Sequence, residues 1–307
     1  MKNTINFYYN IFLDELIKKD NCYYFYYGGD EYYFVPLNRP YDDVQSIYKL
    51  NLEMKKRRCL VHELVLNKDK SIITVVNGIS YVLIKLCKYK NDKVFLNDIN
   101  YIQNMTVNIE CDKSLVRNDW IKLWSEKIDY YEYQISQVGK KYPLLCDSLS
   151  YFIGMGENAI SYLVNNLDSK TNVNLVVSHK RIYQEGGSLN FYDPLNFVVD
   201  SRVRDVAEFI KETFYNKTLN LYDLKSYFNM ANLNKNEYIL LLGRLLFPTY
   251  YFDIYDDIIN KGKSEELVIN IIDRTDEYES LLNTIYKFIL YEKKARLEPI
   301  EWLQDKN

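Results

Sequence analysis

The stretch FYDPLNFVVDSRVRDVAEFI, residues 191–210, decides the fold that we predict. We expect Asp193 to end a short strand and Asp205 to lie at the start of the helix that follows. Three charged residues stand between them: Asp200, Arg202 and Arg204. A carboxylate at a helix N-terminus satisfies free backbone amides and can pair with a nearby cation. The pattern therefore predicts a structural role for Asp205, with one of the two arginines as its partner.

The first third of the chain predicts a small antiparallel sheet crossed by one helix. Aromatic runs at 22–27 and 32–37 flank Gly28, Gly29 and Asp30, which is the signal of a hairpin. Helical spacing covers 42–58, and β-branched runs at 61–69 and 71–87 predict a meander. Residues 1–20 carry acidic groups within their apolar part, so they predict an amphipathic helix rather than a signal peptide.

From Asp119 onward, long amphipathic patterns predict a mainly helical region. Two short strands, at 174–182 and 188–200, are expected to interrupt it. We therefore predict an α+β fold with a small antiparallel β lobe at 1–90 and a larger helical lobe at 91–307. No flexible linker separates them, and we expect a tight junction at about residues 87–100.

The order of these elements resembles that of the kinase-like superfamily, and the charged stretch resembles its metal-binding aspartate with the following helix. Further similar segments follow in the same order: GENAISYL at 156–163, SHKRI at 178–182, RLLFPTYYFDIYDDII at 244–259 and IEWL at 300–303. Together they resemble the bacterial spore-coat kinase-like family of the CotS and YutH type, nearest to the YutH branch. This family belongs to the aminoglycoside-phosphotransferase and choline-kinase group, which implies a two-lobed protein-kinase-like fold.

In active members of that group, the resemblance implies a His-x-Asp loop, a following Asn, a strand Lys and a metal-binding Asp. His179 occupies the position of the loop histidine, but Arg181 stands where the catalytic aspartate is needed. The expected Asn falls near Gly186, and the candidate strand at 31–40 contains no lysine. Asp193 alone remains as a candidate Mg²⁺ ligand.

These losses predict a pseudokinase, a kinase-like protein without catalytic activity, that has a binding or structural role. The resemblance implies spore-coat assembly with protein partners such as other coat proteins, after synthesis in the cytoplasm. No cofactor is expected. The alternative is an active phosphotransferase that uses ATP, with Mg²⁺ on Asp193 and with Glu185 or Asp200 orienting a hydroxyl or amine acceptor. A third interpretation is that the cleft between the lobes binds a ligand but catalyses no reaction.

Composition excludes several other classes of protein. The formal charge of −3 and the pI near 5.7 give no general attraction to nucleic acid. No uncharged apolar run approaches the roughly 20 residues that span a bilayer. Five cysteines without a CxxC pair and only two histidines leave little from which to build a disulfide framework or a zinc site.

Some residues keep two interpretations at this stage. His179 is either a relic of the catalytic loop that bonds to backbone or an ordinary, partly buried histidine. Arg244 lies on an apolar helix and is expected to pair with a carboxylate, for which Asp193, Asp200 and Asp205 are the candidates. The aromatic runs of this tyrosine-rich chain predict core packing, unless they prove exposed and contiguous and form an interaction face.

Overall fold

A computed structural model describes residues 1–89, 91–168 and 173–304. The chain forms two compact units: Met1–Val116 with Leu175–Asp200, and Arg117–Asn174 with Ser201–Asn307. The segment that carries His179 and Asp193 therefore belongs to the sheet-bearing unit. The lobe boundary near residue 90 divides the chain at a different point and stays a prediction.

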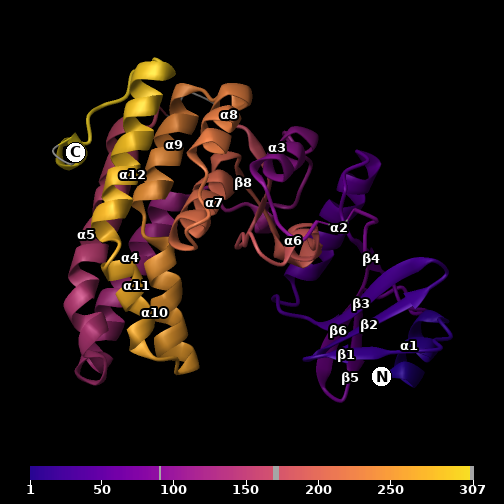
Figure 1. Cartoon of the computed structure of the whole chain (residues 1–307). Helices are drawn as coiled ribbons and strands as arrows, with labels where there is room; N and C mark the ends of the chain where they lie inside the picture. The colour runs from indigo at the N-terminus through magenta and orange to yellow at the C-terminus, as the bar shows by residue number, and fades with distance from the viewer. Residues whose placement is uncertain (90, 169–172, 305–307) are drawn as a thin grey trace. The chain divides into compact units, whose positions relative to one another are not determined.

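The sheet-bearing unit is built on one antiparallel sheet (Figure 1). Its strands are β1 (Ile17–Lys19), β2 (Cys22–Tyr27), β3 (Asp30–Pro36), β4 (Glu63–Val65), β5 (Ile73–Val76) and β6 (Ile79–Lys85). The order is β1-β2-β3-β6-β4, and β5 also pairs with β6. The predicted meander is therefore wrong in detail, because β4 and β5 pair with successive parts of β6 and not with each other.

The predicted hairpin between β2 and β3 is confirmed. Tyr27 pairs with Asp30, and the turn residues Gly28 and Gly29 have φ angles of 61° and 80°. Both values lie in the left-handed region that glycine adopts without steric cost. Two such residues form the turn whose twist matches that of the flanking strands.

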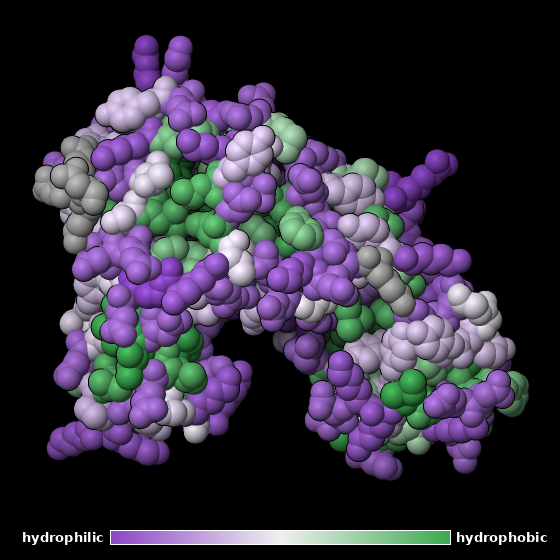
Figure 2. Space-filling view, in the orientation of Figure 1, coloured by the Kyte–Doolittle hydropathy of each residue, from purple (hydrophilic) through white to green (hydrophobic). Residues whose placement is uncertain are grey.

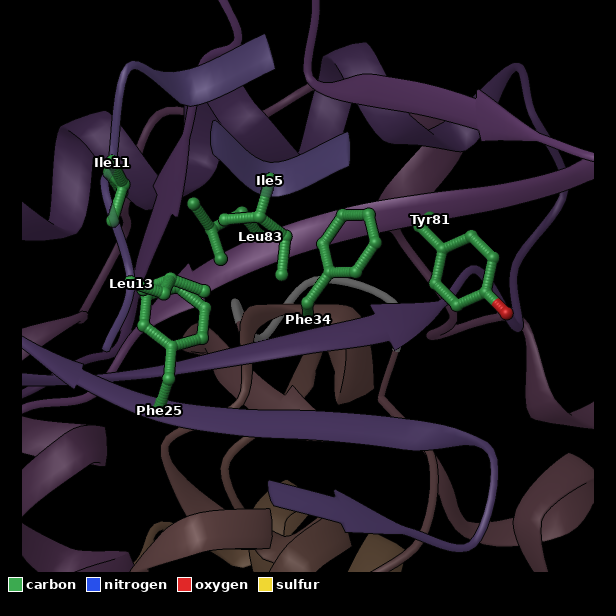
Figure 3. Packing of buried hydrophobic residues seen from close by; sticks show 7 residues of the cluster. All are labelled: Ile5, Ile11, Leu13, Phe25, Phe34, Tyr81 and Leu83. Carbon is green, nitrogen blue, oxygen red and sulfur yellow. The ribbon is translucent and has the colours of Figure 1, made fainter. Parts of the chain in front are cut away.

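One face of the sheet carries the hydrophobic core of this unit (Figure 3). The buried cluster consists of Ile5, Ile11, Leu13, Phe25, Phe34, Tyr81 and Leu83. The predicted N-terminal helix is shorter than expected: α1 covers Lys2–Tyr9, and Asn10 ends it with a φ of 54°. Ile11 and Leu13 then alternate inward onto the sheet, and this burial outweighs the helical pattern of the sequence.

The rest of this unit consists of helices and of a second sheet with two strands, β7 and β8. Its elements are α2 (Asp43–Lys56), α3 (Leu96–Met105), η1 (Lys113–Leu115), β7 (Leu175–His179), α6 (Gly187–Phe191), η3 (Pro194–Asn196) and β8 (Phe197–Ser201). The strand predicted over 188–200 is wrong in its first part, which forms α6 and η3. Pro194 lacks an amide hydrogen and the Asp193 side chain accepts from the amide of Leu195, so the chain turns before the strand begins.

The second unit is helical, as the sequence predicts. It contains α4 (Trp120–Val138), η2 (Gly139–Lys141), α5 (Pro143–Asn166), α7 (Val203–Tyr215), α8 (Leu221–Ala231), α9 (Lys235–Leu246), α10 (Thr249–Lys261), η4 (Glu265–Val268), α11 (Ile269–Ile272), α12 (Thr275–Lys287), η5 (Phe288–Glu292) and α13 (Glu301–Gln304). α9 packs against α5, α7 and α12, and is buried along nearly its whole length.

Hydrophilic side chains cover much of the visible surface of each unit, and apolar side chains are interspersed among the hydrophilic ones (Figure 2). Within the described residues, no helix is both long enough and apolar enough to cross a membrane.

Candidate functional site

His179, at the end of β7, is a buried link between two elements of the sheet-bearing unit. Its side chain is only 1% exposed, and its ring stacks on that of Phe191 at a centroid distance of 4.5 Å. Its Nε2 lies 2.7 Å from the carbonyl oxygen of Phe191. A carbonyl oxygen can only accept, so Nε2 carries the hydrogen. The histidine therefore holds the end of α6 to β7, in keeping with a structural role.

Arg181, two residues after this histidine, has its backbone fixed by Asn196. The Asn196 side chain donates to the carbonyl of Arg181 at 2.8 Å, and its oxygen lies 3.4 Å from the amide nitrogen of Arg181. The guanidinium donates to the carbonyl of Lys180. Sequence reasoning missed Asn196, which lies 15 residues from the arginine that it holds. Because a guanidinium stays protonated, this position offers no proton acceptor.

Asp193 does not end a strand, contrary to the sequence-based expectation, but caps η3. Its Oδ1 accepts from the amide of Leu195 at 2.9 Å. Burial raises the pKa of this carboxyl to about 6, against the opposing effects of that amide, Arg39 and His179. The aspartate near the end of β8 is instead Asp200, which is fully buried.

In the described part of the chain, no group of three or more His, Cys, Asp or Glu side chains lies close enough together to hold a metal ion. Glu185, which the sequence offered as an acceptor-orienting residue, is exposed and forms an isolated β-bridge with Lys93. A metal on Asp193 would therefore need most of its ligands from substrate or water.

Two cations that could meet a phosphate are engaged in structural contacts. Arg39 is buried and donates to the carbonyls of Leu195 and Phe197, and it pairs with Asp43 in the first turn of α2. Lys85 pairs with Asp30, and this partner raises the pKa of the lysine. Strand β3 itself contains no lysine. Arg39 thus fastens α2 to η3 and to the first residue of β8.

A cavity of about 440 Å³ opens in the sheet-bearing unit. It is lined by Tyr24, Glu31, His62, Leu86, Cys87, Tyr89, Asn91, Asp92, Gly186, Ser188 and Leu189. The lining brings together the hairpin, the segment after β6 and the N-terminal part of α6. The lining residues that the structure describes include two carboxylates, Glu31 and Asp92. None of these residues stood out in the sequence as a site residue, since they come from five separate parts of the chain.

His62 connects two walls of this cavity. Its Nδ1 accepts from the amide of Cys87 at 3.1 Å, and its Nε2 donates to the carbonyl of Leu189 at 3.1 Å. The side chain is 2% exposed, and burial lowers its pKa to about 4. The imidazole is therefore neutral at physiological pH, and both its nitrogens are occupied by backbone groups.

Protonation of His62 should destabilise the protein. Because its pKa is 6.5 when unperturbed and about 4 in the fold, the unfolded state binds more protons between these values. The free energy of unfolding should therefore fall as the pH drops from 6.5 through 4, by up to about 3 kcal/mol. Urea unfolding at a series of pH values measures this loss.

Asp193 acts with the opposite sign, which supplies a control. Its pKa rises from 3.8 to about 6 in the fold, so its contribution is present below 3.8 and is lost as the pH rises through 6. Asp193→Asn should therefore steepen the loss of stability on acidification. Adding His62→Gln should flatten it again, and an unchanged slope in that double variant would contradict the assignment to His62.

The remaining arginines that the sequence singled out are held within the helical unit. Arg202 donates to both oxygens of the buried Glu237, at 2.7 and 2.6 Å. Arg244 pairs with Glu208 at 2.7 Å. These two glutamates were not among the expected partners. Arg204 and Asp205 are buried in the first turn of α7, where Arg202 and not Asp205 holds the cap position.

Comparison with known proteins gives a family match over most of the chain. Residues 2–285 match the family described as "Spore coat putative kinase YutH". Over 207 residues the chain is 30% identical to the "Endospore coat-associated protein YutH" of Bacillus subtilis strain 168. That alignment covers 60% of this chain and 61% of the relative, which is less than two thirds of the relative's length.

Solved structures of phosphotransferases share the fold. An aminoglycoside phosphotransferase from Alicyclobacillus acidocaldarius superposes with a TM-score of 0.64 at 10% identity, covering 92% of this chain and 94% of that one. A spectinomycin phosphotransferase, in complex with ADP and spectinomycin, gives a TM-score of 0.59 at 8% identity, covering 86% of this chain and 89% of that one. These likenesses confirm the predicted α+β, aminoglycoside-phosphotransferase-like fold.

Proposed function

The chain belongs to the spore coat YutH family, and we propose that it is a non-catalytic, kinase-like component of the spore coat with a binding or structural role. The relative from Bacillus subtilis is described as endospore coat-associated, which supports the location. Coat proteins are the partners that this proposal implies.

The observation that carries the proposal is Arg181, two residues after the buried His179. Phosphoryl transfer to a hydroxyl needs a carboxylate there to orient the acceptor and take its proton. A guanidinium can do neither, and Asn196 holds the backbone of Arg181 on both sides. Since catalytic residues act as a unit, loss of one already costs several powers of ten in rate.

The alternative is an active phosphotransferase that holds Mg²⁺ on Asp193. Thermal unfolding separates the two, because a ligand that binds only the folded state raises the unfolding midpoint. We expect millimolar ATP with Mg²⁺ to leave the midpoint where Mg²⁺ alone leaves it. A rise that needs both ATP and Mg²⁺ and that disappears in Asp193→Asn would contradict the proposal. Each variant is compared with itself without ligand, so its own stability does not enter.

A further inference from the structure

The helical unit has a shallow apolar hollow between α8 and the end of α12. We call it the α8–α12 hollow. It is lined by Leu221, Leu224, Lys225 and Phe228 of α8 and by Thr284, Ile285 and Phe288. Its free volume is about 20 Å³, far less than the roughly 300–1,000 Å³ of small-ligand sites. The hollow therefore suits the tip of a side chain from another protein rather than a whole small molecule.

Positive charge surrounds this hollow. The ammonium groups of Lys225 and Lys293 lie 5.6 and 5.7 Å from the ring centre of Phe288. Together, α8 and residues 284–294 contain four lysines and two acids. One of these acids, Glu292, pairs with Lys225 at 3.7 Å, but both side chains are more than half exposed. Such exposed pairs are weak, so the surroundings of the hollow favour an acidic partner.

A second apolar surface lies on η4 and α11, and we call it the η4–α11 patch. It consists of Leu267, Ile269 and Ile272, which are 44%, 41% and 37% exposed. Val268 and Ile271 lie between them in the sequence and are fully buried, so the segment is anchored to the unit. Single exposed apolar side chains are common, but a group of them marks a contact site.

Negative charge accompanies the η4–α11 patch. Residues 265–273 contain three acids and no basic residue. The flanking cations Lys263 and Arg274 each pair with an acid outside this range, at 2.5 and 2.8 Å. The patch and the hollow therefore have opposite charges around apolar centres. Opposite charges of this kind steer two surfaces together and fix how they meet.

The patch and the hollow lie at opposite ends of α12 (Figure 1). The patch ends at Ile272, shortly before α12 begins at Thr275, and the hollow is lined from Thr284 to Phe288. Because an α-helix rises 1.5 Å per residue, the two surfaces are on the order of 15–20 Å apart. The patch of one molecule therefore does not reach its own hollow.

We propose that the η4–α11 patch of one copy of this chain docks into the α8–α12 hollow of a second copy. Leu267, the most exposed of the three patch residues, enters the hollow, and the acids beside it face the lysines around the hollow. Such a contact uses two different surfaces, so association continues beyond a dimer unless it closes into a ring. This inference rests on the proposed structural role in the coat and names one partner.

Sedimentation velocity of the purified full chain at low salt tests the contact. The monomer has a mass of 36.8 kDa. The average mass should at least double as the concentration rises from about 1 to about 100 μM, the range of a small, weak interface. Leu221→Lys in the hollow and Leu267→Lys in the patch should each stay monomeric. Val164→Lys, at an exposed apolar site of α5 in the same unit, should associate like the natural chain.

A mixture of the two monomeric variants distinguishes this contact from a symmetric one. Leu221→Lys keeps an intact patch and Leu267→Lys keeps an intact hollow. An equimolar mixture should therefore form pairs of twice the monomer mass and nothing larger. A mixture that stays monomeric, or either variant associating alone, would overturn the inference. Both replaced side chains are 44% exposed, so the variants should unfold at the midpoint of the natural chain, which confirms that they fold.

The contact and the proposed function fail in different experiments. A natural chain that stays monomeric up to about 100 μM would overturn the contact and leave the non-catalytic function standing. A rise of the unfolding midpoint that needs both ATP and Mg²⁺ would overturn the non-catalytic function, whereas the sedimentation of the natural chain and of the mixture would still decide the contact.

Discussion

Replacing Glu208 with alanine should lower the free energy of unfolding of the helical unit by about 3–5 kcal/mol, the cost of breaking a buried ion pair. Oε1 of Glu208 accepts from Arg244 at 2.7 Å and from Lys211 at 3.3 Å, and Oε2 accepts from Thr249 at 2.8 Å. The side chains of Arg244 and Lys211 are only 4% and 2% exposed. Without the carboxylate, two cations would remain buried together.

The pKa of Lys211 shows that this burial already costs free energy. Burial lowers it to about 8, and Glu208 is the main group that raises it again. The Arg244 guanidinium also lies 4.8 Å from the ring centre of Trp120. Since the described tryptophans Trp120, Trp124 and Trp302 all lie in this unit, tryptophan fluorescence during urea unfolding reports on it directly.

Glu277→Ala is the matched control. Glu277 pairs with Arg274 at 2.8 Å, nearly the same distance, but its side chain is 63% exposed. Pairs at such sites contribute from about 0 to 1 kcal/mol. If Glu208→Ala cost no more than Glu277→Ala, the buried network would not stabilise the unit. Glu208→Gln, which keeps the shape and loses the charge, should lie between the two.

Local sequence signals predicted the elements whose structure is decided locally. The paired glycines set the hairpin turn, and the helix that was predicted to start near Asp205 is α7, which begins at Val203. The N-terminal helix was predicted too long because the sequence does not say that Ile11 and Leu13 meet the sheet. Around Asp193, one proline and one carboxylate set the turn, and these outweighed the β-branched pattern beside them.

The candidate site was predictable only where its residues are neighbours in sequence. His179 and Arg181 could be found from their spacing and from the resemblance to kinases. His62 could not, because its partner Leu189 lies 127 residues away. The contacts of Arg39 span 156 and 158 residues. In such pairs, a side chain bonds to a backbone group that has no backbone partner in the fold. Neither hydrophobic periodicity nor a sequence motif indicates which backbone groups these are.

Replacing Gly187 with alanine should lower the free energy of unfolding of the sheet-bearing unit by about 3–4 kcal/mol, from left-handed strain and lost hydrogen bonds. Gly187 has a φ of 47°, and an added Cβ would lie 1.8 Å from the carbonyl oxygen of Asn91. This neighbour is backbone, so α6 or the segment at 91–92 must move. The contacts between Ser188 and Asn91, at 2.8 and 3.1 Å, would then be lost.

Gly28→Ala separates the two causes. Gly28 also has a positive φ, of 61°, but no atom lies within 4 Å of its added Cβ, so only the strain of about 1–2 kcal/mol applies. Hydrogen exchange at the amides of Asn91 and Ser188 should accelerate in Gly187→Ala and not in Gly28→Ala. Equal losses of stability would mean that the close approach at Gly187 is easily relaxed. Ser188 and Leu189 line the cavity. Faster exchange in Gly187→Ala alone would therefore also show that the close approach of Gly187 to Asn91 helps to set the shape of the cavity.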